Sequence, residues 1–138
     1  MANAIYPLFK QEILKGTSNN LLNSSEGATG VFCALVDTGT YSYSASHQFF
    51  SSLSGIVGTD QEILTKTQAL GVFDGTDLTY TAVTGASVEA LVLYRKNAGA
   101  NTTWPLIAYI DTSVTGLPVT PNGGNITITW NASGIFSL

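Results

Sequence analysis

Residues 87–96 read SVEALVLYRK, and this stretch decides the fold. The segment 90–94 within it is apolar at every position. Side chains alternate between the two faces of a strand, so a strand formed here is apolar on both faces. A strand of that kind fits the middle of a sheet that is covered on both sides. The stretch therefore predicts a central strand with other strands beside it.

Strand signals continue on both sides of this stretch. Two segments, 77–83 and 125–130, alternate apolar with polar side chains, which is the pattern of a half-buried strand. Apolar composition predicts three more strands, at residues 31–37, 103–111 and 135–138. In the second half of the chain the gaps are too short for crossover helices, so antiparallel pairing is expected. The fold class is therefore predicted as mainly β, an antiparallel β-sandwich or barrel.

A short N-terminal α-helix is predicted at residues 5–15. Its apolar residues are spaced by four, which places on one face Ile5, Phe9 and Ile13. Pro7 suits the first turn, and Gly16 suits the C-terminal cap. A helix this short is marginal alone in water, so we expect it to dock on its own domain or on a neighbouring subunit.

The 138 residues are expected to form a single β-rich domain. Residues 1–16 are its N-terminal helix or arm, and residues 30–138 are its β body. The segment 17–30 between them is rich in Ser, Asn and Gly, which predicts a loop. Two apolar residues, Leu21 and Leu22, are expected to pin part of this loop to the domain.

The segments between the first two strong strand signals are less regular. Residues 41–44 fit a short strand or an extended loop, and residues 61–70 are predicted to be extended. Residues 45–53 predict a helical turn with Ser46 as its N-cap. Its apolar side chains are expected to face the core: Phe49, Phe50 and Leu53.

The chain is poor in charge. Charged residues make up 10% of it, against about 25% in typical soluble domains. Such a surface suits extensive contact with other protein subunits, because buried interface cores are depleted of charge. The net charge is −4, and the five Lys and Arg form no cluster beyond Arg95 and Lys96, so nucleic-acid binding is not expected. No secretory signal and no apolar run of membrane-spanning length occur, so synthesis in a cytoplasm without membrane insertion is expected.

Few residues fit catalysis or metal binding. His47 is the one histidine, and it fits a packed side chain better than a catalytic base. Cys33 lies in an apolar run, which predicts a buried thiol. Asp74 and Asp77 fit a turn better than a calcium site, because the rest of a calcium-binding loop is missing. We therefore predict no catalytic, metal-binding or cofactor-binding residue and no enzymatic activity.

Residues 116–130 read GLPVTPNGGNITITW and raise the question of a phosphate-binding loop. Phosphate loops of that kind lead into the N-terminus of a helix, whereas the residues after Gly124 predict a strand. The stretch is therefore interpreted as a bend that feeds a strand. The chain also holds Asn-x-Ser/Thr patterns, which we attribute to chance in a chain rich in these residues, at Asn23, Asn101, Asn125 and Asn131.

Several segments together carry a resemblance that covers nearly the whole chain. They are residues 1–6 with Phe9, Lys10 and Leu14, and residues 34–41, 71–74, 79–83, 89–94, 106–111, 116–124 and 135–138. These segments resemble a family of small virion structural proteins of tailed bacteriophages and prophages. The resemblance is weakest at residues 54–61 and 97–104, where protein-specific contacts are expected.

The resemblance implies a non-enzymatic capsid decoration (cement) protein on the outer face of an icosahedral head. Such proteins contact the major capsid protein and are commonly β-rich and often trimeric. The expected location is the virion, after synthesis in the cytoplasm of a bacterial host. The alternative is a low-copy tail, neck or head-fibre component that binds the host surface or another virion protein. A third interpretation is a small hydrolase that acts on envelope glycans.

The two ends of the chain are the expected attachment points, because the helix is apolar on one face and the last strand is apolar. Unpaired strand edges and terminal segments recruit partners. The predicted interface residues are Ile5, Tyr6, Phe9, Ile13, Phe136 and Leu138.

Overall fold

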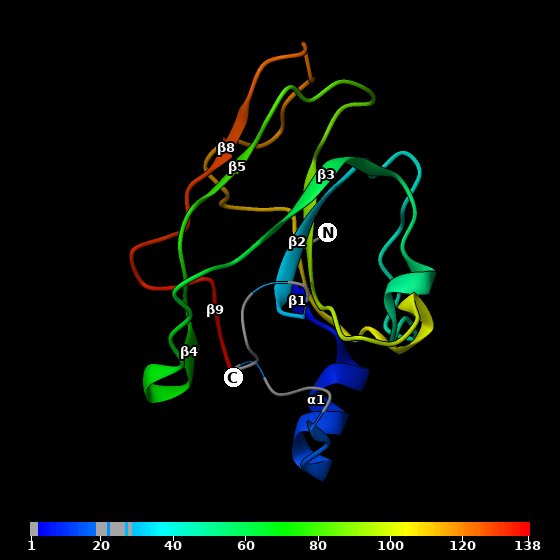
Figure 1. Ribbon diagram of the computed structural model, residues 1–138, viewed down its shortest axis with the longest axis vertical. Helices are drawn as coiled ribbons and strands as arrows, with labels where there is room; N and C mark the ends of the chain where they lie inside the picture. Colours follow the sequence, from blue (N-terminus) through cyan, green and yellow to red (C-terminus); the bar gives the residue numbers. More distant parts are fainter. Residues whose placement is uncertain (1–2, 19–21, 23–26, 28) are drawn as a thin grey trace.

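The computed structural model describes residues 3–18, 22, 27 and 29–138. Its centre is a five-stranded antiparallel sheet in the order β1-β7-β6-β2-β3 (Figure 1). The strands are β1 (Ala4–Ile5), β2 (Val31–Val36), β3 (Ile56–Glu62), β6 (Ala90–Arg95) and β7 (Leu106–Ile110). Strand β6 lies in the middle between β7 and β2, which confirms the prediction of a central strand.

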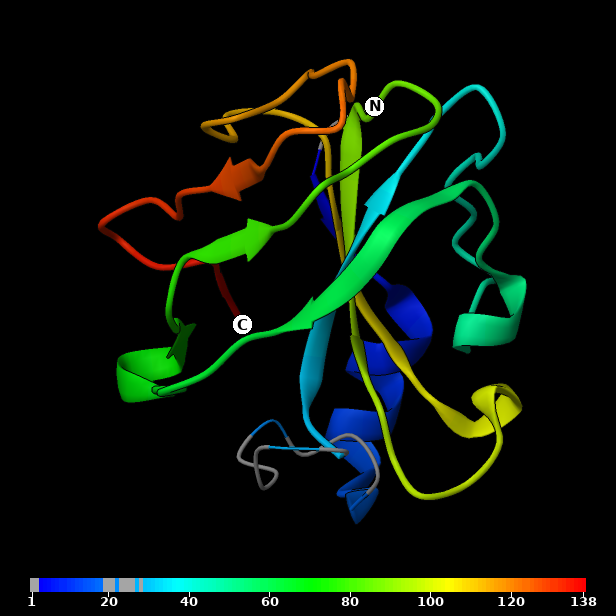
Figure 2. The same ribbon diagram turned by 45° about the horizontal axis from the view of Figure 1, so that its top comes forward.

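In the described part of the chain, two smaller antiparallel pairs of strands accompany the five-stranded sheet. Strand β4 (Val72–Phe73) pairs with β9 (Phe136–Ser137), and β5 (Leu78–Tyr80) pairs with β8 (Ile126–Ile128). Figure 2 shows β5 and β8 lying side by side. The Tyr80 hydroxyl donates a 2.8 Å hydrogen bond to the Cys33 carbonyl and so links β5 to the large sheet. The fold is mainly β and sandwich-like, with antiparallel strands and one short α-helix, as predicted.

Both faces of β6 are buried. Leu93 lies opposite Cys33 on β2 and Ala108 on β7, and all three side chains are buried. The next residue, Tyr94, points to the other face, where its ring lies 4.4 Å from the Phe50 ring. The apolar run that decided the fold is thus buried on both faces, and the segment that includes Phe50 covers the face on which Tyr94 lies.

The helix α1 (Pro7–Lys15) begins with proline in its first turn and ends at Gly16, whose φ of 72° is left-handed. Both features match the sequence prediction, because proline fixes φ at a helix start and glycine adopts left-handed φ without strain. The prediction that Ile5 belongs to the helix is wrong. Ile5 lies in β1 and pairs with Ala108 of β7, because the chain runs extended along the sheet before Pro7 turns it.

Strand β3 overlaps the predicted extended segment only at Gln61 and Glu62. The extended segment was placed at 61–70, whereas β3 spans Ile56–Glu62 and a short 3-10 turn follows at Ala69–Gly71. Strand β3 is at the sheet edge, so most of its side chains are at least partly exposed and its sequence is not apolar. Gly58 also has a φ of 74°, which interrupts the regular extended backbone. An edge strand of this kind has no alternation that a pattern could detect.

The predicted helical turn at 45–53 reduces to a 3-10 turn at Phe50–Ser52, and Ser46 is not its N-cap. The N-cap is Phe49, which is extended and bridges to Pro105. This pairing holds Phe49 in a strand-like conformation, so a helix cannot begin earlier. Residues 41–44 form a loop rather than a strand. A further 3-10 turn, Asn101–Thr103, delays the start of β7 to Leu106.

The smaller strands also end earlier than predicted. Strand β5 stops at Tyr80, and Ala82 leaves the ladder with a φ of 49°. Strand β8 keeps the expected alternation, with Ile126 and Ile128 buried and Thr127 exposed. The glycine-rich stretch before it is a bend, as predicted, because Gly116 and Gly123 have φ values of 108° and 86°. Most of the predicted loop at 17–30, including Leu21 and Asn23, lies outside the described residues.

The central strand sets the stability of the fold. We expect Leu93→Ala to lower the free energy of unfolding by about 2–5 kcal/mol, because it leaves a cavity in a fully buried position. Leu14→Ala is the matched control, since Leu14 is 88% exposed and its truncation should cost less than about 0.5 kcal/mol. Chemical denaturation of both variants measures the difference. Equal losses would contradict the central position of β6.

Candidate functional site

The two ends of the chain meet in one apolar groove. It is lined by Ile5, Lys10, Ile13, Leu14, Ser137 and Leu138 and has a volume of about 330 Å³. We call it the terminal groove. One wall is helix α1, and the other is the end of β9, which lies near α1 in Figure 1. Leu14 and Leu138 are 88% and 61% exposed, so this groove presents apolar surface to solvent.

A second hollow continues from the terminal groove along β1. Its lining comes from β1 with Asn3, from β7 and from the segment 135–137, and its volume is about 260 Å³. We call it the edge hollow. Ile5 and Ser137 line both spaces, so the groove and the hollow adjoin at these two residues. Together they run between β1 and β9, which are the first and last strands of the chain.

The predicted interface residues divide between this surface and the core. Ile5, Ile13 and Leu138 line the terminal groove, and Phe136 lines the edge hollow. Tyr6 and Phe9 are 0% and 1% exposed and pack inside the same chain. The helix therefore docks on its own domain, and only part of its apolar face remains for a partner.

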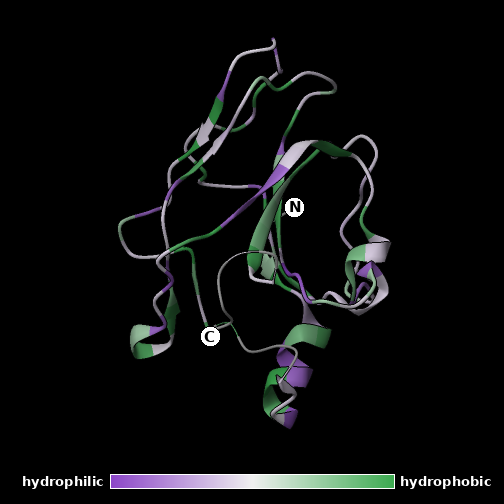
Figure 3. Ribbon diagram, in the orientation of Figure 1, coloured by the Kyte–Doolittle hydropathy of each residue, from purple (hydrophilic) through white to green (hydrophobic). Residues whose placement is uncertain are grey.

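Three groove residues escaped sequence reasoning: Lys10, Leu14 and Ser137. The prediction followed the spacing of four from Ile5, which leads to Phe9 in the core and to Ile13 at the groove. Lys10 and Leu14 are also spaced by four, on the neighbouring side. That spacing was the available signal for this side of the helix, but a lysine in the sequence does not indicate an apolar surface. Figure 3 shows hydrophobic and hydrophilic residues interleaved along α1, in contrast to the hydrophobic β2.

A buried chain of hydroxyl groups anchors the start of the helix. The hydroxyls of Tyr6 and Tyr41 are 2.8 Å apart, and the Tyr41 hydroxyl lies 2.9 Å from Nδ1 of His47. Burial raises the pKa of Tyr6 and of Tyr41, so both phenols stay neutral. The rings of Tyr43 and Tyr109 pack against this chain of hydroxyls. The wall of the groove that α1 forms is thereby tied to the core.

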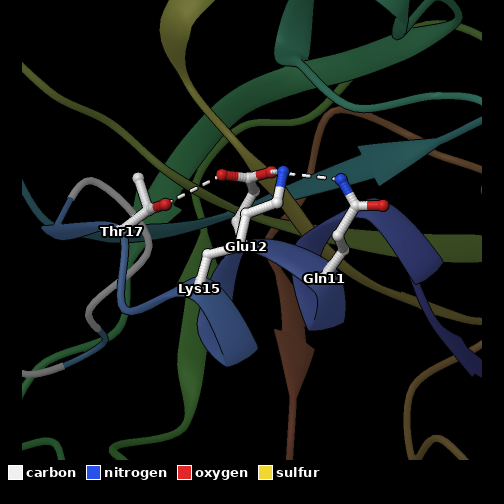
Figure 4. A network of polar contacts seen from close by, with 4 residues as sticks. All are labelled: Gln11, Glu12, Lys15 and Thr17. Atoms are coloured by element: carbon white, nitrogen blue, oxygen red, sulfur yellow. Dashed lines mark hydrogen bonds and ion pairs between the residues drawn. The ribbon is translucent and has the colours of Figure 1, made fainter.

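A network of polar contacts secures the other end of the helix (Figure 4). Glu12 accepts hydrogen bonds from Lys15 at 2.9 Å, from Thr17 at 2.8 Å and from Gln11 at 3.3 Å. These hydrogen bonds lower the pKa of Glu12 to about 2, and the bond from Lys15 has the largest effect. Glu12 and Lys15 thus neutralise each other on one flank of α1. Lys10, on the other flank, is the one charged side chain among the residues that line the groove and the hollow.

The two residues considered for catalysis, His47 and Cys33, are packed within the fold. His47 is half-buried and contacts Tyr41 as described above, which fits the packed histidine that the sequence favoured. Cys33 is fully buried, and burial raises the pKa of its thiol to about 12, so the nucleophilic thiolate is scarce at neutral pH. Neither side chain lines the terminal groove.

The residues of the candidate calcium site make hydrogen bonds to neighbouring segments. A carboxylate oxygen of Asp77 accepts a 2.9 Å hydrogen bond from the Trp130 backbone, and the Asp74 backbone pairs with Thr67. Among the described residues, no group of three or more His, Cys, Asp or Glu side chains could hold a metal ion. Within the same part of the chain, no helix has the length and apolar character needed to cross a membrane.

Comparison with known proteins gives no relative from which function could be transferred. No protein-family model matches the chain, and no curated protein matches it significantly.

We expect the polar network on α1 to be visible in a pH titration. The folded-state pKa of Glu12 is about 2 and its ordinary value is 4.5, so the ionised carboxylate stabilises the fold above pH 4.5. That contribution is lost as the pH falls from 4.5 toward 2. Lys15→Gln should move the Glu12 pKa toward 4.5, because it removes the largest cause of the shift. Side-chain NMR titration measures this.

Lys10→Gln is the control for this titration, since Lys10 lies on the opposite flank of the same helix and makes no contact with Glu12 in the network. It should leave the Glu12 pKa where it is. An unchanged Glu12 pKa in the Lys15→Gln variant would show that the network does not form in solution.

Proposed function

We propose that this chain is a non-enzymatic structural protein of a bacteriophage virion. In this proposal it decorates the outer surface of the icosahedral capsid and stabilises the shell through contacts with the major capsid protein. The observation that carries the attachment role is the terminal groove, in which both chain ends bring exposed apolar side chains together. The virion assignment rests on the sequence resemblance, which covers nearly the whole chain.

The surface chemistry supports a role in assembly. A protein with 10% charged residues has little long-range electrostatic repulsion and pays a small desolvation cost when a partner covers its surface. Exposed leucines gathered at one groove add a favourable hydrophobic term when they are covered. Self-association as a homotrimer belongs to the same proposal, and the other exposed surfaces of the β body are open to it.

The alternative proposal is a low-copy tail, neck or head-fibre component that binds the host surface or another virion protein. An aromatic cluster favours it, because the rings of Phe50, Tyr94 and Trp104 pack together with the Lys96 ammonium 5.1 Å from the Trp104 ring. Trp104 closes the segment 97–104, where the resemblance is weakest. The copy number per particle separates the two proposals.

We expect quantitative mass spectrometry of CsCl-purified particles to find this protein at a copy number comparable with that of the major capsid protein. A decoration protein occupies every equivalent position of the shell, whereas a tail, neck or fibre component does not. A few copies per particle would favour the alternative. Absence from purified particles would refute both proposals.

We expect Leu14→Gln to weaken binding to particles that lack the protein by roughly 10-fold, because an apolar side chain in the contact becomes polar. Leu70→Gln is the matched control, since Leu70 is likewise an exposed leucine but lies outside the terminal groove. Co-sedimentation with particles measures binding, and thermal unfolding checks that both variants stay folded. Equal binding of the two variants would exclude the terminal groove as the attachment surface.

A further inference from the structure

The free edge of β1 borders the terminal groove. Strand β1 is the first strand of the five-stranded sheet, so one of its edges has no strand beside it in the described part of the chain. The Tyr6 N–H donates to the Ile107 carbonyl at 3.0 Å, and Ala4 pairs with Tyr109. Residues of an antiparallel strand bond alternately to one side and the other. The N–H and C=O of Ile5 therefore point away from β7.

The free edge of β9 borders the same space. The Leu138 N–H donates a hydrogen bond to the Gly71 carbonyl at 3.0 Å. The preceding residue, Ser137, lies opposite Val72 and takes no part in that hydrogen bond. By the same alternation, the N–H and C=O of Ser137 point away from β4. Ile5 and Ser137 are the two residues shared by the terminal groove and the edge hollow. Two strand edges with outward main-chain groups thus flank one apolar space.

The main-chain groups and the lining together define what fits this space. Outward N–H and C=O groups on a strand edge bind an extended segment by strand addition. The aliphatic walls take aliphatic side chains, and Lys10 as the one charged lining side chain favours a carboxylate. A second copy is a poor occupant when the same surfaces of two chains face each other, because it brings a second Lys10 to the contact and like charges repel.

We propose that the terminal groove and edge hollow bind an extended aliphatic segment of another virion protein that carries an acidic residue beside Lys10. The segment adds as a strand to the free edge of β1 and covers Leu14 and Leu138. This proposal rests on the proposed virion function, since it names the partner chemistry of the same surface. It adds that the partner contributes a strand, and that its sequence is recognisable by aliphatic residues next to a carboxylate.

The test is photo-crosslinking in intact particles. Particles are assembled with p-benzoylphenylalanine in place of Leu14, and in a matched control in place of Thr127, which is exposed on β8 away from the groove. After irradiation, mass spectrometry identifies the crosslinked peptide. We expect the Leu14 probe to capture one segment of a different virion protein, with aliphatic residues and Asp or Glu, and the Thr127 probe not to capture that segment.

The charge is tested separately. Lys10→Glu should lower the crosslink yield at Leu14 roughly 5-fold, and Lys10→Arg should retain it, because an exposed pair of opposite charges is replaced by a repulsive pair. Crosslinks from Leu14 to a second copy or to its own chain, or none, overturn the proposal, as does equal yield from both Lys10 variants. Mass spectrometry of the particles before irradiation shows whether they contain the protein. Its absence would refute the proposed function itself, apart from any result of the crosslinking.

Discussion

The fold depends on burying both faces of β6. Leu91 and Leu93 are fully buried, and the Tyr80 hydroxyl of β5 reaches the sheet and bonds the Cys33 carbonyl. On the opposite face, Tyr94 packs against Phe50. A strand that is apolar on both faces cannot stay in a single-layer sheet, because one face would remain in water. Elements outside the sheet, including the long loop after β2, therefore cover β6.

How much the sequence predicts follows from the same constraint. Wherever burial imposes a pattern, the pattern is visible: β6 is apolar throughout, and β8 alternates Ile126, Thr127 and Ile128. Where pairing alone holds the backbone, nothing local marks it. Strand β1 has only two residues and exists because β7 offers an edge, and β3 is an exposed edge strand with Gly58 inside it. These elements are products of tertiary contact and could not be found from periodicity.

The candidate site was predictable in part for a related reason. Apolar residues at both chain ends predicted that the ends form a contact surface, and Ile5, Ile13 and Leu138 do line one groove. The sequence could not divide the helix between core and surface, because that division depends on where the helix docks. The Tyr6 hydroxyl contributes to this docking by bonding Tyr41, a residue far along the chain. With Tyr6 and Phe9 buried, Lys10 and Leu14 face outward.

The two walls of the groove differ in how firmly the fold holds them. Helix α1 is fixed by buried Phe9 at its start and by the Glu12 network at its end. Strand β9 belongs to a two-stranded pair, held to β4 by a short ladder and by the Phe73 and Phe136 rings, 5.1 Å apart. An isolated strand pair is marginal in water, and a third strand strengthens it. A segment bound between β1 and β9 would therefore stabilise β9 more than α1, which couples attachment at the groove to the order of the chain's last strand.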